Sequence, residues 1–272
     1  MSAKKMTLAK ALNAGMRKAM QGDPKVVLLG EDIGRLGGVF RITEGLIDDF
    51  GEERVIDTPL AESGIVGTAV GLALRGYRPV VEIQFDGFVY PGFDQIVTQL
   101  AKYHFRSSGR ISVPVVVRIP YGGGIGAIEH HSESPESYFA HTPGLKVVTC
   151  ATPNDAYWMI QQAIASDDPV IFLEPKRRYH EKGEVDLSEP PLRLDAARTV
   201  VLVRTDADTI DTPAASNPID RMTVVGRAQD RIDGQIDEHT RRLGVLQRRR
   251  AALDKLLFPK QYAEYQEHLR TY

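Results

Sequence analysis

The chain has few of the features that mark secreted or membrane proteins. It contains a single cysteine, Cys150, so no disulfide can form within the chain and no cysteine cluster can hold a metal. No apolar run approaches the length of a membrane-spanning helix, and the opening residues are too polar for a signal peptide. These absences favour a cytoplasmic protein that does not act in a membrane.

The chain also lacks an excess of charge of either sign. It has 34 Lys and Arg against 36 Asp and Glu, a formal net charge of −2, which gives no general attraction to nucleic acid or anionic lipid. The arginine-rich segments RRL and QRRR could suggest nucleic acid, but arginines on the outer face of a helix are usually solvated. The composition is that of an ordinary globular protein without a nucleic-acid partner.

Apolar strand-like segments alternate with helical patterns through the first two thirds of the chain. Leu8, Leu12, Met16 and Met20 follow helical spacing, and a second helix is expected over 155–165 with Asn154 as its N-cap. Strands are expected at 25–30, 54–59, 79–85, 111–120, 145–150 and 169–175. This alternation predicts an α/β fold with a doubly wound parallel sheet, in which sites lie beyond the carboxyl ends of the strands.

The character of the sequence changes after Pro175. Residues 1–175 are expected to form the α/β domain, 176–226 a linker and 227–272 a helical tail. Residues in the tail alternate four and three apart in a heptad pattern: Ile232, Ile236, His239, Leu243, Leu246, Arg250, Leu253 and Leu257. This long C-terminal helix could lie on the core or form a coiled coil with another chain.

Residues 57–108 contain the first candidate site. Glu62 stands in the first turn of an expected helix that carries Gly64, Gly67 and Gly71. A glycine costs a helix about 1 kcal/mol relative to alanine, so this face predicts the close approach of another backbone or a ligand. A glutamate in the first turn often only complements the helix dipole. With the glycine face beside it, the carboxylate is a candidate site residue.

A long loop over 121–144 contains His130, His131 and His141. A loop of this length in a compact domain is usually functional or disordered. Its Gly-x-Gly-x-x-Ala run, 122–127, formally fits the dinucleotide fingerprint of nicotinamide-dependent oxidoreductases, but no helical pattern follows it. A metal site at His130, Glu129 and His141 would lack a helix to set the spacing. Neither interpretation is adopted.

Five segments together resemble one family. They are DTPLAESGIVG, EIQFDGFVYPGFDQIV, AKYHFRS, HHSESPESYFAHTPGLKVV and DDPVIFLEPKRRY, and the resemblance covers most of residues 5 to 200. The family is that of the beta subunits of thiamine-diphosphate-dependent 2-oxoacid dehydrogenases. HSESPES and EPKRRY favour the branched-chain type over the pyruvate or acetoin types. The resemblance implies a transketolase-like pyrimidine-binding domain.

The resemblance also implies roles for single residues. Glu62 aligns with the glutamate that hydrogen-bonds the cofactor's aminopyrimidine ring, and Phe88 with an aromatic residue that stacks on that ring. His131 aligns with the histidine that assists acyl transfer to a lipoyl arm, a role that suits an imidazole with a pKa near 6.5. Leu60 and Gln84 are carried over as wall residues. Without the resemblance, Phe88 could equally be a core residue.

Thiamine enzymes anchor the diphosphate and Mg²⁺ through a GDG motif, and this chain contains none. In the family, that half of the site belongs to the alpha subunit. The expected partners are therefore an alpha subunit that carries the Mg²⁺, a lipoyl acyltransferase component and a 2-oxo acid. This chain would supply half of a shared thiamine-diphosphate site and no metal ligand.

The resemblance ends near residue 200. Family members continue into a second α/β domain, whereas this sequence continues as linker and one long helix. A truncation, a frameshift or a fusion would each explain the difference. The alternative to a catalytic subunit is therefore a non-catalytic remnant that only binds partners.

Overall fold

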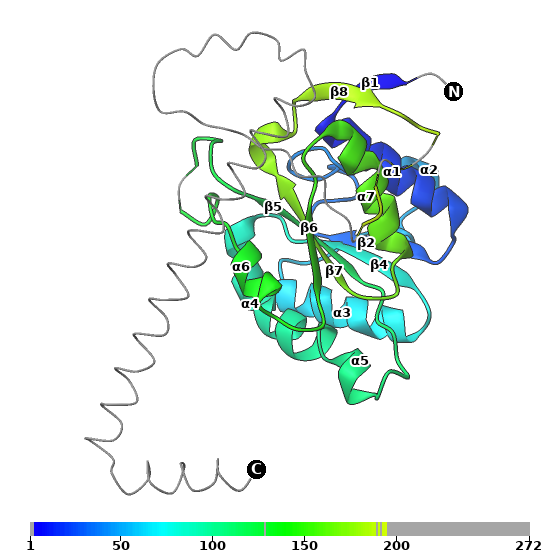
Figure 1. Ribbon diagram of the computed structural model, residues 1–272, viewed down its shortest axis with the longest axis vertical. Coiled ribbons are helices and arrows are strands. Elements are labelled where there is room, and N and C mark those ends of the chain that lie inside the picture. Colours follow the sequence, from blue (N-terminus) through cyan, green and yellow to red (C-terminus); the bar gives the residue numbers. More distant parts are fainter. Residues whose placement is uncertain (1–2, 128, 189, 191, 195–272) are drawn as a thin grey trace, which may run out of the picture. The chain divides into compact units, whose positions relative to one another are not determined.

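A six-stranded parallel sheet forms the centre of the domain, with the order β3-β2-β4-β5-β7-β6. The computed structural model describes residues 3–127, 129–188, 190 and 192–194 (Figure 1). The strands of this sheet are β2 (Val26–Gly30), β3 (Val55–Asp57), β4 (Arg78–Glu82), β5 (Val116–Tyr121), β6 (Lys146–Thr149) and β7 (Val170–Pro175). The prediction of an α/β fold with a parallel sheet is confirmed.

Each face of the sheet has its own apolar core, because successive strand side chains point to opposite faces. Val80 and Val116 pack on the side of the helices α1, α2 and α7, whereas Val81 and Val117 pack on the side of α3. The principal helices are α1 (Leu8–Gly22), α2 (Leu46–Phe50), α3 (Glu62–Leu74), α4 (Val89–Asp94), α5 (Tyr103–Arg106), α6 (Glu136–Ala140) and α7 (Pro153–Ala165). The sheet is therefore doubly wound, as predicted.

Helix α7 begins earlier than the sequence suggested. Its N-cap is Thr152, whose hydroxyl accepts from the backbone N–H of Asp155, while the Asp155 carboxylate accepts from the N–H of Thr152. Pro153 occupies the first helical position, where a missing N–H costs nothing. Asn154 is not the cap; its side-chain oxygen accepts from the N–H of Asp186 instead.

The segment after Pro175 starts with regular structure. A 3₁₀ turn, η3 (Lys176–Arg178), is followed by β8 (Lys182–Val185). Strand β8 pairs antiparallel with β1 (Lys4–Thr7) in a separate two-stranded sheet. The expected linker therefore begins with two elements that fold onto the domain. The rest of the linker after residue 194, and the helical tail at 227–272, lie outside the described residues.

The glycine face of α3 is not closely packed in the described domain. A Cβ added to Gly71 would meet nothing within 4 Å, and one on Gly64 or Gly67 would make only ordinary contacts at 3.6 Å. No element of the described residues approaches this face closely, and the expected approach of another backbone or a ligand stays a prediction. A close approach does occur one helix later, at Gly92 of α4, whose added Cβ would lie 3.3 Å from the carbonyl carbon of Glu62.

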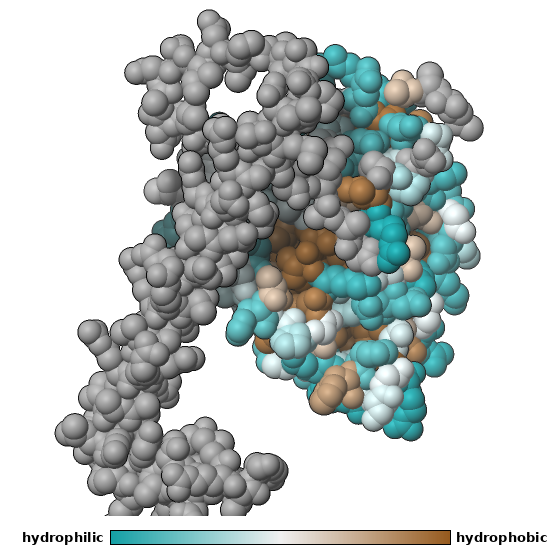
Figure 2. All heavy atoms as spheres, in the orientation of Figure 1, coloured by the Kyte–Doolittle hydropathy of each residue, from teal (hydrophilic) through white to brown (hydrophobic). Residues whose placement is uncertain are grey.

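Strand β6 forms one edge of the sheet, and its side chains Val147 and Val148 are only partly buried. In Figure 2, apolar residues gather around the position that β6 occupies in Figure 1, whereas much of the described surface around them is polar. In the described part of the chain, no helix is both long and apolar enough to cross a membrane.

Candidate active site at the carboxyl ends of the strands

The candidate residues follow the carboxyl ends of neighbouring strands. The chain runs from β2 out to β3 and then returns to β4 on the other side of β2, which makes a topological switch point. Open α/β sheets bind ligands in the crevice at such a point. Glu31 follows β2, Gln84 follows β4, and Glu62 lies beyond β3 at the start of α3. The topology thus brings these three residues to the carboxyl-end side of the sheet.

Glu62 is the first residue of α3, and its side chain is 6% exposed. The glycine at position 92 lets α4 pack directly against the backbone and Cβ of this residue. Helix α4 follows η1 (Asp86–Phe88), so the same short segment carries the aromatic residue Phe88. The start of α3, which carries this carboxylate, is therefore packed directly against α4.

Glu31 is a further candidate site residue, which the sequence analysis did not identify. It is 6% exposed, and its Oε1 atom is buried with no hydrogen-bond partner in the described residues. Burial raises the pKa of this carboxyl, and the nearby charge of Glu62 raises it further. A charged residue directly after the apolar strand 25–30 was the signal that could have identified it. An unpaired buried carboxylate oxygen needs a partner, which a bound ligand can supply.

Three rings form an aromatic group that follows the carboxyl ends of β4 and β5. The ring of Phe85 lies 4.2 Å from the imidazole of His131 and 5.6 Å from Phe88, centroid to centroid. The centroids of Phe88 and His131 are 5.4 Å apart, with the rings nearly perpendicular. The structure therefore brings together the candidates Phe88 and His131, which are 43 positions apart in the sequence. Phe85, which was not a candidate, contacts both of them.

The hydrogen bonds of His131 assign its tautomer. Its Nδ1 lies 2.7 Å from the backbone carbonyl oxygen of Glu129, and a carbonyl only accepts. In the neutral ring Nδ1 therefore carries the hydrogen, and Nε2 carries the lone pair. The imidazole is partly exposed, so Nε2 can accept a proton from a ligand in the crevice.

Arg118, on β5, is the centre of a buried charged network. Arg118 donates to Glu174 at 2.6 and 3.0 Å and to Glu82 at 2.6 Å, and the Tyr179 hydroxyl donates to Glu174 at 2.7 Å. Burial raises the pKa of Glu82, an effect that Arg118 opposes. Burial lowers the pKa of Arg118, but its two carboxylate partners outweigh that effect and leave the pKa raised.

The two expected wall residues are placed differently from each other. Gln84 is partly buried, and its side-chain amide lies 3.4 Å from a carboxylate oxygen of Asp32. Leu60 is 77% exposed, so within the described residues it forms no packed wall. It lies between β3 and α3, two residues before Glu62.

The rejected alternatives find no support in the described residues. The loop after β5 continues to residue 135 before the five-residue helix α6, so no long helix follows the glycine run. Among the described residues no group of three or more His, Cys, Asp or Glu could hold a metal ion. Glu129 and His130 are exposed and 3.7 Å apart, and His141 is exposed at the end of α6.

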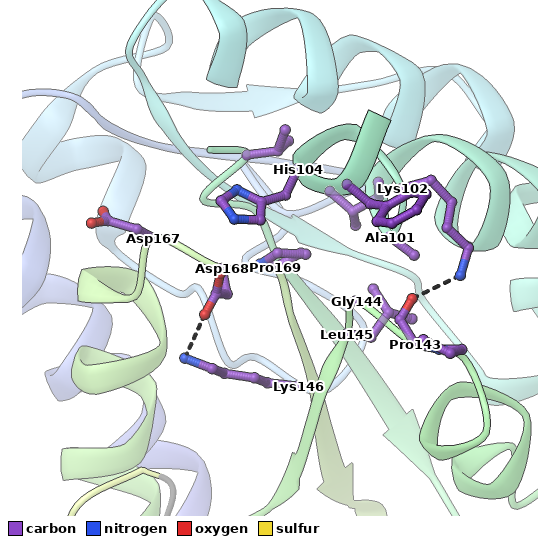
Figure 3. Close-up of a pocket in the computed structure, with 13 residues that line it drawn as sticks. Ala101, Lys102, His104, Pro143, Gly144, Leu145, Lys146, Asp167, Asp168 and Pro169 are labelled. Atoms are coloured by element: carbon purple, nitrogen blue, oxygen red, sulfur yellow. Dashed lines mark hydrogen bonds and ion pairs between the residues drawn. The ribbon is translucent and has the colours of Figure 1, made fainter. Parts of the chain in front are cut away.

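A cavity of about 600 Å³ lies at the opposite edge of the sheet, at the amino ends of β5, β6 and β7 (Figure 3). Its lysines already have partners within the cavity: Lys146 lies 2.9 Å from Asp168, and Lys102 donates to the carbonyl of Pro143 at 2.8 Å. The buried carboxylates and the aromatic group lie at the other edge. We therefore place the candidate site there, and not in this cavity.

The fold and the match to a family model define the class of the domain. Residues 4–182 match the family model described as "Transketolase, pyrimidine binding domain", and the chain belongs to this family. The solved structure of a split gene transketolase, an inactive beta4 tetramer, has a similar fold, with a TM-score of 0.53 at 18% identity over 69% of this chain and 56% of that chain.

Relatives named as dehydrogenase beta subunits are much closer in sequence. The pyruvate dehydrogenase E1 component subunit beta of Leifsonia xyli is 69% identical over 72% of this chain and 58% of its own length. The 3-methyl-2-oxobutanoate dehydrogenase subunit beta of Mycobacterium tuberculosis is 60% identical over 69% of this chain and 54% of its own length. The resemblance to these beta subunits is confirmed, and the chain spans less than two thirds of either relative.

Proposed function

We propose that this chain supplies the aminopyrimidine half of a thiamine-diphosphate site and acts as the beta subunit of a 2-oxoacid dehydrogenase. The reaction is oxidative decarboxylation of a 2-oxo acid, with transfer of the acyl group to a lipoyl carrier. One observation carries the proposal: in a domain of this family, the buried carboxylates of Glu31 and Glu62 and an aromatic group with His131 all follow the carboxyl ends of neighbouring strands around the switch point of the sheet.

The residues fit an aminopyrimidine, which is a flat ring with polar nitrogen atoms. The partly buried Phe88 offers an aromatic face, and Glu62 offers a buried carboxyl to a ring nitrogen. The buried Oε1 of Glu31 has no hydrogen-bond partner in the described residues, so it can bond to a polar group of a bound ligand.

When bound, thiamine diphosphate supplies the nucleophilic carbon and the electron sink for decarboxylation. Glu62 holds a proton at the ring nitrogen, in a position where little water competes because the side chain is buried. Glu31 holds its own proton to a higher pH than an exposed glutamate does, because its pKa is raised by burial and by Glu62. Nε2 of His131 accepts or returns a proton during acyl transfer.

The alpha-type partner supplies the anchor for the diphosphate and Mg²⁺, because the chain has no GDG motif. Exposed apolar side chains near this crevice support a covering partner. Leu60 is 77% exposed, and Tyr90 and Tyr138 are 44% and 50% exposed with their rings 6.5 Å apart. The lipoyl acyltransferase component is expected to reach the crevice from the same side.

The substrate is pyruvate or a branched-chain 2-oxo acid. The sequence motifs favoured the branched-chain acid, but the relative named for pyruvate is 69% identical and the one named for 3-methyl-2-oxobutanoate is 60% identical. The relatives therefore do not single out the branched-chain type. A comparison of kcat/KM for the two acids decides between them.

The experiment is co-expression with an alpha-type subunit, followed by size-exclusion chromatography and an assay of thiamine-diphosphate-dependent decarboxylation. The decisive variant is Glu62→Gln, which keeps the side-chain shape and removes the carboxyl. We expect kcat to fall by about a hundredfold or more. Glu136→Gln is the matched control, because Glu136 is an exposed glutamate that also stands in the first turn of a helix.

A stable complex in which only Glu62→Gln loses turnover supports the proposal. Near-normal turnover by Glu62→Gln would remove the assigned role of this carboxylate. A folded chain that forms no complex would instead favour the alternative, a remnant that has lost its catalytic function.

A further inference from the structure

A fully buried ion pair lies behind the aromatic group, and the proposed chemistry does not use its charges. Lys176 follows β7 directly, and Asp86 begins the 3₁₀ turn η1 after β4. The Lys176 Nζ lies 2.8 Å from the Asp86 Oδ1, and both side chains are completely buried. The two residues are 90 positions apart in the sequence, so this contact joins two distant strand ends.

Asp86 also joins a third strand end. Its Oδ2 accepts a hydrogen bond of 3.2 Å from the backbone N–H of Gly122, the first residue after β5. The next residue, Gly87, donates its N–H to the carbonyl of His130 at 3.1 Å. One carboxylate thus fixes the start of η1 against the loops that follow β5 and β7.

The pair also lies near the ring of Phe85, which contacts the candidate residues. The ammonium of Lys176 lies 5.7 Å from the centroid of the Phe85 ring, within reach of a cation–π interaction. Phe85 in turn contacts both His131 and Phe88. A shift of Lys176 or Asp86 would therefore change the distance between the imidazole and the Phe88 ring.

Stability alone is a poor explanation for this pair. Removing two charges from water costs free energy that their attraction only partly offsets, so a buried pair is weak evidence for stabilisation. A pair with defined hydrogen bonds does fix the geometry of the elements that carry it. We propose that Lys176 and Asp86 are positioning residues that hold Phe88 and His131 at the spacing required around the cofactor ring. The proposal rests on the proposed function of this site.

The test uses the double variant Lys176→Met/Asp86→Asn in the full chain. Each single variant would leave one buried charge unpaired and could fail to fold, whereas the double variant removes both charges and keeps similar shapes. Asparagine can still accept from the N–H of Gly122. The matched control is Lys146→Met/Asp168→Asn, which removes the half-exposed pair on the far edge of the sheet. Ile160→Val, in the core between α1 and α7, controls for a general loss of stability.

The first measurement is the histidine NMR spectrum of the chain alone, with the His131 ring signal assigned by its loss in His131→Gln. Two aromatic rings within 5.4 Å should displace this signal from its unfolded position. We expect the folded double variant to move it toward that position and both controls to leave it unchanged. An unchanged signal in the folded double variant, or an equal change in Ile160→Val, would overturn the proposal.

The second measurement is activity in the complex with the alpha-type subunit. We expect the double variant to lower kcat for lipoyl acylation by roughly ten- to a hundredfold, because small displacements of reacting groups have effects of that size, with KM for the 2-oxo acid little changed. Normal kcat in the double variant would overturn the proposal. If the wild-type complex is inactive, the proposed function fails, while the NMR result still decides whether the pair positions His131.

Discussion

At the scale of single residues, the site depends on which nitrogen of His131 is free to take a proton. The Nδ1–H donates to the Glu129 carbonyl, so Nε2 is the atom that would exchange a proton in the proposed acyl transfer. We expect His131→Ala to lower lipoyl acylation by about a hundredfold or more, and decarboxylation with an artificial electron acceptor much less. His141→Ala is the control, because His141 is exposed at the end of α6. Equal losses in the two assays would rule out a specific role in acyl transfer.

The protonation of Glu31 gives a second test at this scale. Burial and the charge of Glu62 raise its folded-state pKa above 4.5, so the folded chain binds more protons than the unfolded chain above that pH. The free energy of unfolding should therefore fall as the pH rises from about 4.5 through the folded-state pKa. Glu82 contributes a fall in the same direction, because its pKa is also raised.

The contribution of Glu31 is isolated by comparing Glu31→Gln with the wild type. Urea unfolding at a series of pH values between 4 and 8 should show a smaller decrease in stability for Glu31→Gln. Glu136→Gln, which changes an exposed glutamate, should keep the wild-type profile. If Glu31→Gln keeps the full decrease, Glu31 is not the group that titrates.

At the scale of secondary-structure elements, much of the fold could be predicted from the sequence. Buried parallel strands are short apolar runs bounded by turn residues, and six such runs became the six strands of the sheet. The carboxyl ends of parallel strands meet at one edge, which is why Glu62, Phe88 and His131 could be assigned to one region. Their chemical roles came from the resemblance to a family.

Other features depend on contacts between distant segments and leave little local signal. Strand β8 exists because it pairs with β1, about 180 residues away, in a polar sequence that reads as linker. The Lys176–Asp86 pair spans 90 residues and looks like two ordinary surface charges in the sequence. The cap of α7, by contrast, is locally encoded, because Thr152 and Asp155 form a capping box with Pro153 at the first helical position.

Glycine positions test how the elements of the site pack. A Cβ on Gly87 would lie 2.5 Å from the Cα and the carbonyl oxygen of His130, so Gly87→Ala must push η1 and the histidine loop apart. We expect it to destabilise the chain by about 1–3 kcal/mol and to lower activity. On α3, Gly71→Ala meets nothing within 4 Å and should stabilise the isolated chain by about 1 kcal/mol. Urea unfolding measures both changes, and equal effects would contradict this packing.

At the scale of the whole molecule, the proposed function gives this chain one side of the cofactor site. The pyrimidine-binding family covers residues 4–182, and the beta subunits named above extend well beyond the part that this chain matches. Under the proposed function, the anchor for the diphosphate lies on an alpha-type subunit. Tight cofactor binding should therefore be a property of the assembled complex and not of the isolated chain.

The difference in cofactor binding between the complex and the isolated chain can be measured by thermal unfolding. A ligand that binds only the folded state stabilises it by about 2.7 kcal/mol at a concentration of 100 times its Kd. We expect thiamine diphosphate with Mg²⁺ to raise the Tm of the complex with an alpha-type subunit and to leave the Tm of the isolated chain unchanged. NAD should change neither, because the described residues contain no long helix directly after the glycine run that follows β5. An isolated chain stabilised by thiamine diphosphate would show that it holds a complete site. Stabilisation by NAD would instead restore the dinucleotide interpretation of residues 122–127.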